Sequence, residues 1–248
     1  MAVKSAVRAL EIFELLAKNK NGLSVVDIGK NLNIPQSSAS NLVKTLLDSG
    51  YLTRDETKKY VLGVRLIQLG AVAMESLDIG VVAKPILQKL VEKVQETVFL
   101  AIRAQNEVVY ILKIDSNSSV NTTAQPGYHR PLYHTGLGKA FLSSMTKKEQ
   151  NEILSNIDLI AITSHTVTDK ETLIEQLEQF RCQGYAIDDE EGEYGLYCIA
   201  TTVTNCNKNI EAAISISGLK TRLLPKKDII TGYLIDSANE ISQRLGGR

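Results

Sequence analysis

The stretch from His134 to Ala140 contains residue types that can bind an anion. Its sequence, HTGLGKA, resembles a phosphate-binding loop, but the first glycine of that motif would fall at Tyr133, and Lys139 is followed by Ala rather than Ser or Thr. A simpler use remains, because small residues before a helix leave N–H groups exposed at its positive end, where a carboxylate can bind. A tight turn without a ligand is an equal alternative.

Two further polar groups lie in strand-like segments nearer the C-terminus. The run from Asp188 to Glu191 holds four consecutive acids, which cannot converge on one point from the end of a strand. By itself such a run is typical of a solvated loop. Ser215 and Ser217 alternate with isoleucines, so both hydroxyls face one side of a sheet. Hydroxyls in an apolar setting need hydrogen-bond partners, which a polar ligand could supply.

Catalytic and metal chemistry find little support in the sequence. It contains no Gly-x-Ser-x-Gly motif, no His near a candidate nucleophile and no Cys-x-x-Cys or His-x-x-x-His pair. Three cysteines at irregular spacing fit reduced thiols better than a disulfide framework, and a redox switch at Cys198 is kept as an alternative. We therefore expect no catalytic residue, no metal site, no cofactor and no enzymatic activity.

Length and hydropathy indicate a globular protein of two domains. A chain of 248 residues suits a small domain joined to a larger one. No apolar run approaches the ~18 residues of a membrane span, so we expect no membrane partner. The first residues interleave charged with apolar side chains and lack the uninterrupted core of a secretory signal, which favours the cytoplasm.

Charge is unevenly distributed along the chain. Residues 1–63, the N-terminal segment, hold nine Lys or Arg against six Asp or Glu, a net charge of +3. The rest of the chain carries −3, which gives the overall net charge of zero. A basic segment on a mildly acidic body favours a polyanion as the partner of that segment alone.

The N-terminal segment is expected to begin with three helices. Apolar residues at helical spacing predict the first helix, namely Val3, Ala6, Val7, Leu10, Phe13 and Ala17. Ser24 with Asp27 three residues later predicts an acidic capping box at the start of a short second helix. Asn33 makes the turn into a third helix, which Pro35 opens and Gly50 follows in the left-handed region.

A hairpin is expected after the third helix. Residues 51–54 and 59–62 have strand patterns and are joined by a short polar turn. The order of helix, helix, turn, helix and basic hairpin is that of a winged helix-turn-helix, whose third helix enters the major groove of DNA. The alternative is a protein-interaction domain with the same fold.

The outward face of the third helix carries short polar side chains where an ordinary surface helix has Glu and Lys. Such groups suit base edges and phosphates. We assign base contacts to Gln36, Ser37, Ser38, Ser40 and Asn41. We assign phosphate contacts, which make affinity fall with salt, to Arg8, Lys44, Arg54, Lys58 and Lys59. Because Asn and Gln pair best with adenine, an A·T-rich half-site is favoured.

The remaining residues read as a linker followed by a larger domain. Residues 64–80 predict a connecting helix that can also pair with a second copy, and residues 81–248 the larger domain, whose first helix opens at Pro85. Strand patterns occur at 97–104, 107–115, 118–124, 184–191, 196–203 and 210–218, and helical patterns at 138–145, 147–153, 170–182 and 226–245. This order predicts an α+β domain around an antiparallel sheet with one open face.

Several sequence blocks together resemble the IclR (isocitrate lyase regulator) family of bacterial transcription factors over nearly the whole chain. They are the helix-turn-helix and wing, PLYHTGLGKAFL at 131–142, GYAIDDEE at 184–191, CIATTV at 198–203 and AAISISG at 212–218. The resemblance implies a GAF/PAS-like domain that binds a small effector, often a carboxylate or aromatic metabolite. It also implies a homodimer or dimer of dimers on double-stranded DNA at a pseudopalindromic operator.

The same resemblance implies an effector site. It implies that the effector is held by the amides of Gly136, Leu137 and Gly138 and by the side chains of Asp188, Cys198, Ser215 and Ser217. Of the four consecutive acids, the resemblance therefore places only Asp188 in the pocket. Two positions depart from the family pattern: Asn41 replaces an Arg in the third helix, and Arg130 stands one residue after the place of a common Arg, which is His129 here. We expect Arg130 on the surface, with the pocket as the alternative.

The expected function is that of a ligand-responsive, DNA-binding transcriptional regulator, more often a repressor than an activator in such families. A metabolite-binding sensor or enzyme that uses the winged helix for protein docking is the alternative.

Overall fold

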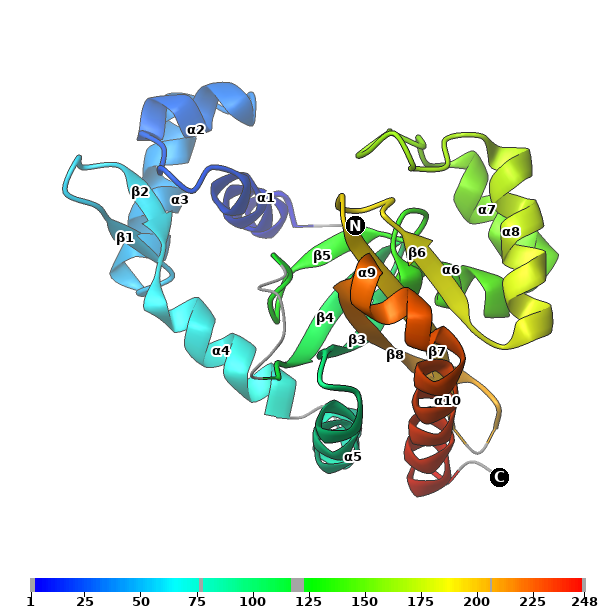
Figure 1. Ribbon diagram of the computed structural model, residues 1–248. Helices are drawn as coiled ribbons and strands as arrows, with labels where there is room; N and C mark the ends of the chain where they lie inside the picture. The colour runs from blue at the N-terminus through cyan, green and yellow to red at the C-terminus, as the bar shows by residue number, and fades with distance from the viewer. Residues whose placement is uncertain (1–2, 76–77, 117–122, 206, 247–248) are drawn as a thin grey trace. The chain divides into compact units, whose positions relative to one another are not determined.

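The computed structural model describes residues 3–75, 78–116, 123–205 and 207–246 (Figure 1). They fall into two compact units that divide between Ser76 and Leu77. Each unit has its own hydrophobic core, and each is described separately below.

The N-terminal unit contains the expected winged helix-turn-helix. Its elements are α1 (Lys4–Lys18), α2 (Val25–Asn31), α3 (Gln36–Asp48), β1 (Leu52–Arg54), β2 (Tyr60–Leu62) and α4 (Val64–Glu75). The two short strands pair in antiparallel register as the wing, with Arg54 opposite Tyr60.

Local backbone signals in this unit act as predicted. The Ser24 hydroxyl accepts the N–H of Asp27 at 3.2 Å, and the Asp27 carboxylate accepts the N–H of Ser24 at 3.3 Å, which completes the capping box. Asn33, in the turn before α3, has a φ of 48°, and Gly50 after α3 has a φ of 76°. These left-handed residues reverse the chain at both ends of the third helix.

The first helix is present as predicted, but of the apolar residues that predicted it only Phe13 packs against the core. Val3 and Leu10 are 67% and 60% exposed, whereas Ile12 and Leu16 pack into the core of the unit. The helix is apolar on two sides, and spacing alone does not say which side packs. The exposed side is available to another surface.

The second unit is built on a six-stranded antiparallel sheet in the order β5-β4-β3-β8-β7-β6. The strands are β3 (Thr97–Ala104), β4 (Glu107–Ile114), β5 (His129–Pro131), β6 (Ala186–Asp189), β7 (Leu196–Thr204) and β8 (Ile210–Leu219). Together with the helices below, this confirms the expected α+β domain.

Helices cover both faces of this sheet, so the expected open face is wrong (Figure 1). One face packs against α5 (Asp78–Val94) and α10 (Lys227–Arg244), and the other against α6 (Gly136–Ser144), which in turn packs on α8 (Lys170–Gln183). The remaining helices are α7 (Lys147–Ser155), α9 (Lys220–Leu223) and the 3-10 turn Leu224–Lys226. Successive side chains along a strand therefore alternate between two cores, one on the α5 and α10 side of the sheet and one on the α6 side.

Two expected elements differ from the structure, and a third cannot be compared with it. The strand predicted at 118–124 lies mostly outside the described residues, and β5 pairs with β4 at that edge. Pro85 lies inside α5 rather than at its start. Because proline has no N–H, the Val81 carbonyl four residues earlier lacks its helical hydrogen bond. Val81 is 68% exposed, so water can donate to this carbonyl instead. The connecting helix predicted at 64–80 is divided between α4 and α5. Across the described residues, no helix is long and apolar enough to cross a membrane.

Candidate functional site

A solvent-open cavity of about 630 Å³ lies on the α6 side of the sheet, and we call it the α6 cavity. Its polar floor follows from strand register: Asp188 of β6 pairs with Cys198 of β7, and Cys198 pairs with Ser217 of β8. Side chains directly opposite each other on paired strands share a face. Ser215 lies two residues before Ser217 on the same face and also lines the cavity. The structure thus brings together four residues that the sequence singled out.

The first turn of α6 forms another wall of this cavity. Gly136 and Leu137 line it, as expected, and a Cβ at position 136 would come within 2.8 Å of the Cys198 sulfur. Thr135 caps the helix by accepting the N–H of Gly138 at 3.0 Å. The N–H of Gly138 is therefore already used.

In this structure Gly138 is not placed as the expected effector contact. It is absent from the cavity wall, and a Cβ there would come within 2.2 Å of the Leu132 carbonyl oxygen. The glycine is needed because helix α6 packs closely on the chain that leads into it.

Arg130 lines the α6 cavity, which corrects the expectation that it faces the surface. In the β4–β5 pair, Arg130 lies opposite Val108, whose side chain packs in the core on the α6 side. The neighbouring His129 points to the opposite face, where it is exposed and its Nδ1 lies 2.9 Å from Glu107. Strand alternation decides between the two residues once β5 is known to be a strand.

Four other residues of the cavity wall carried no signal in the sequence, namely Phe99, Tyr110, Glu193 and Leu196, and His134 stood out only as the first residue of the HTGLGKA stretch. The rings of Phe99 and Tyr110 meet edge to face at a centroid distance of 5.2 Å. Burial raises the pKa of the Tyr110 hydroxyl, so it stays protonated and can donate a hydrogen bond. Only alternation along β3 and β4, combined with knowledge of which face of the sheet borders the cavity, would have found this pair.

Asp188 has an unusual electrostatic environment. Burial raises the pKa of its carboxyl to about 7, and the nearby Glu191 carboxylate acts in the same direction. The N–H groups of Glu191 and Gly192, at 2.8 and 3.3 Å from Oδ1, and the Lys139 ammonium oppose that rise. Asp188 can therefore exchange a proton near neutral pH.

Two other titratable groups of the wall stay neutral at pH 7. Burial lowers the pKa of the His134 imidazole to about 4 and raises the pKa of the Cys198 thiol to about 12. A protonated thiol is a poor nucleophile and reacts slowly with oxidants, which argues against the redox switch considered for Cys198.

Two buried polar atoms in the wall have no hydrogen-bond partner within the described part of the chain. They are Nδ1 of His134 and Oγ of Ser215. Leaving a buried polar group unpaired costs about 1–3 kcal/mol. A polar ligand or water in the α6 cavity would satisfy them.

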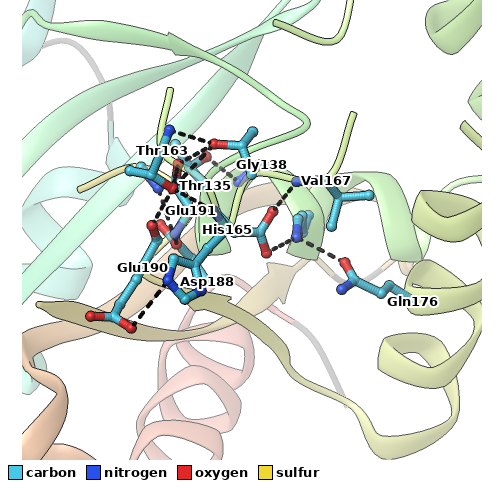
Figure 2. Close-up of polar contacts among 12 residues, drawn as sticks. Thr135, Gly138, Thr163, His165, Val167, Gln176, Asp188, Glu190 and Glu191 are labelled. Carbon is cyan, nitrogen blue, oxygen red and sulfur yellow. Dashed lines mark hydrogen bonds and ion pairs between the residues drawn. The ribbon is translucent and has the colours of Figure 1, made fainter. Parts of the chain in front are cut away.

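The acidic run is not the solvated loop that was expected, because Glu191 is buried and forms an ion pair with the fully buried Lys139 of α6 (Figure 2). Glu190 has a φ of 62°, and this left-handed residue turns the chain so that Glu191 points back toward α6. Consecutive acids can therefore diverge to different environments.

The residues expected to contact DNA belong to helices α1 and α3 and to the wing of the N-terminal unit. Gln36, Ser37, Ser40, Asn41 and Lys44 are exposed along α3, and Ser38 is half-buried. Ser38 and Asn41 share a shallow groove with Arg8 of α1, so the structure brings this distant cation beside the third helix.

At the wing, Lys58 and Lys59 are exposed. The Arg54 guanidinium lies 4.8 Å from the centre of the Tyr60 ring and donates a hydrogen bond to its hydroxyl, which holds the cation in place. DNA contact by these residues remains a prediction.

Comparison with known proteins gives matches along most of the chain. The model of the IclR helix-turn-helix domain matches residues 5–56, and that of the bacterial transcriptional regulator IclR C-terminal domain matches residues 71–243. The HTH-type transcriptional repressor AllR of Escherichia coli K12 is 35% identical over 241 residues, which cover 96% of this chain and 89% of the relative. The HTH-type transcriptional regulator XynR of the same strain is 33% identical over 222 residues, covering 89% and 88%.

Solved structures agree with these matches. The crystal structure of Thermotoga maritima IclR has a TM-score of 0.74 and 31% identity, and the match covers 98% of this chain and 99% of that one. An IclR homolog from Microbacterium hydrocarbonoxydans, complexed with 4-hydroxybenzoate, has a TM-score of 0.80 and 25% identity, with 97% of each chain covered.

Proposed function

This chain belongs to the IclR family of bacterial transcriptional regulators, and we propose that a small carboxylate bound in its α6 cavity controls operator binding by its winged helix-turn-helix. The protein is a ligand-responsive, DNA-binding transcriptional regulator. Repression is the proposed sign, because AllR is named a repressor. Because the proposed partner is DNA, we also place the protein in the cytoplasm. We propose that its activity is regulation rather than catalysis.

The observation that carries the carboxylate proposal is the meeting of two positive groups in one cavity. The first turn of α6 presents the positive end of the helix at Leu137, and Arg130 lines the same space. An Arg guanidinium and a helix N-terminus both favour a carboxylate. The bound 4-hydroxybenzoate of the Microbacterium homolog is also a carboxylate.

The wall formed by the sheet strands favours a second polar group on the effector. Asp188, Ser215 and Ser217 offer hydrogen-bonding groups there, and the Ser215 oxygen has no partner in the described residues. A hydroxy or oxo acid satisfies this wall better than a purely apolar acid. We therefore propose a small carboxylate that also bears a hydroxyl or carbonyl group.

An operator-binding titration tests this proposal. Duplex DNA from upstream of the protein's own gene is titrated with protein in the presence of 4-hydroxybenzoate and of two- to six-carbon hydroxy and oxo acids. At least one acid should change operator affinity by about 10- to 100-fold. Arg130→Met should weaken that response at least tenfold and leave effector-free DNA binding intact, whereas the exposed Arg103→Met control should do neither.

The proposal fails if Arg130→Met responds like the parent protein, or if no acid in the panel alters operator binding. Energetic coupling supplies an independent check, because DNA must change effector affinity by the same factor as the effector changes DNA affinity.

We also propose that two copies of the chain associate, as a dimer or a dimer of dimers, through an apolar face of α4. Ile67 is 71% exposed, and Val64 and Val72 are 66% and 64% exposed. A second copy is the proposed occupant, because two-fold pairing presents two recognition helices to a pseudopalindromic operator. Ile67→Glu should reduce the molar mass measured by light scattering and should weaken operator binding. The exposed Gln68→Glu should change neither property. An unchanged molar mass for Ile67→Glu refutes this interface.

A further inference from the structure

The Lys139 side chain is fully buried in the second unit, and it lies outside the wall of the α6 cavity. Its ammonium donates to the Glu191 carboxylate and, at 2.9 Å, to Oε1 of Gln176 on α8. A buried ammonium is costly unless it is paired and hydrogen-bonded. Lys139 therefore ties α6 to the chain after β6, in agreement with the sequence, whose resemblance to a phosphate-binding loop is incomplete.

Glu191 in turn joins two loops. Its Oε2 accepts the N–H of Val167 at 3.3 Å, and its carbonyl oxygen accepts the Thr166 hydroxyl at 2.7 Å. Thr163 donates its hydroxyl to the neighbouring carbonyl of Glu190 at 2.6 Å. Figure 2 shows these contacts converging from separate segments on the residues after Asp188.

The loop that Glu191 anchors also supplies the hydrogen bonds of Asp188. Oδ1 of Asp188 accepts the N–H groups of Glu191 and Gly192, and Gly192 itself lines the α6 cavity. Lys139 lies two residues beyond Leu137, which forms the cavity wall at the start of α6. One ion pair therefore connects helix α6 with the loop after β6, and both segments contribute residues to the cavity wall.

We propose that Lys139 and Glu191 are a positioning pair, which aims the Asp188 carboxyl into the α6 cavity and sets its charge. The pair touches no effector in this arrangement and acts through Asp188. This inference rests on the proposed effector role of the cavity, but its central test needs no effector.

The charges around Asp188 give the pair a distinct signature. The Glu191 carboxylate makes ionisation of Asp188 harder, and the Lys139 ammonium makes it easier. The weak acids Cys198 and Tyr110 also face it, and Arg130 and His134 line the same cavity. Neutralising either member of the ion pair should therefore move the Asp188 titration, in opposite directions for the two members.

The test follows the Asp188 carboxyl carbon by NMR in full-length protein labelled at aspartate side chains, with Asp188→Asn to assign the signal. Glu191→Gln keeps the side-chain shape and should move the midpoint from about 7 to lower pH, by about one pH unit, which is a tenfold change in proton affinity. Lys139→Met should move it to higher pH. Glu240→Gln removes the exposed pair with Arg244 and should leave it unchanged.

A second variant and a second measurement cover the case in which Lys139→Met does not fold. Lys139→Met with Glu191→Gln removes both charges together, and replacing a whole buried pair is tolerated better than breaking it. In this folded double variant, hydrogen exchange at the Glu191 and Gly192 amides should accelerate at least tenfold, because the loop has lost its anchor to α6.

Two results would overturn the pair's positioning role. One is an unchanged Asp188 midpoint in folded Glu191→Gln. The other is an unchanged rate of amide exchange at Glu191 and Gly192 in the folded double variant. A pair that only stabilises the fold would change neither the midpoint nor the exchange rate. Failure of the effector proposal looks different: no acid alters operator binding, while the Asp188 midpoint still moves as described.

Discussion

Replacing Asp188 by Asn should stabilise the second unit above pH 7. Burial raises the pKa of this carboxyl from 3.8 to about 7, so the folded protein holds the proton more tightly than the unfolded chain does. The resulting stability is fully present below pH 3.8 and is lost as pH rises to about 7. The loss amounts to at most about 4 kcal/mol, and water in the open cavity reduces it.

Asparagine keeps part of this arrangement. Its Oδ1 can still accept the N–H groups that Glu191 and Gly192 donate to Asp188. Its amide nitrogen must find a partner, at a cost of about 1–3 kcal/mol if it finds none. At pH 8 we therefore expect Asp188→Asn to raise the free energy of unfolding by about 1–3 kcal/mol.

Urea unfolding followed by tyrosine fluorescence measures this change. The chain has no Trp and nine Tyr, seven of which lie in the second unit, so the signal reports mainly on that unit. Wild-type stability should fall between pH 5 and pH 8 by more than that of Asp188→Asn. The exposed Asp236→Asn removes the same kind of charge from α10 and should behave like wild type.

If Asp188→Asn is no more stable than wild type at pH 8 and has the same pH dependence, Asp188 is ionised in the folded protein and the electrostatic argument is wrong. The functional consequence has a definite sign as well. An anionic effector binds better beside a neutral carboxyl, so its affinity should increase as pH falls through about 7.

Three further predictions concern other parts of the chain. Lys58→Ala with Lys59→Ala should weaken operator binding and reduce the slope of log affinity against log salt by about 2, measured by fluorescence anisotropy. Gly138→Ala places a Cβ 2.2 Å from a backbone carbonyl and should lower the thermal midpoint by more than about 5 °C, whereas Gly232→Ala, with open space around it, should not. Cys198→Ser should leave the response of operator binding to peroxide unchanged, because the buried thiol is protonated.

Much of the N-terminal unit could be predicted from local sequence. The capping box of Ser24 and Asp27 and the left-handed Gly50 are set by neighbouring backbone groups, so they need no knowledge of the rest of the chain. Strand alternation likewise placed Ser215 and Ser217 on one face of β8. The inclusion of Asp188 and Cys198 in the site came from family resemblance instead.

The sequence by itself determined most of the order of elements, the two-domain α+β class and the partner class, because capping, turns and periodicity act over a few residues. Tertiary structure alone decided that Ile12 rather than Leu10 packs, that Arg130 enters the cavity, and that Lys139 meets Glu191 across 52 positions of chain. Each depends on which surfaces meet when strands and helices pack, and burial then fixes whether a charged side chain is solvated or paired.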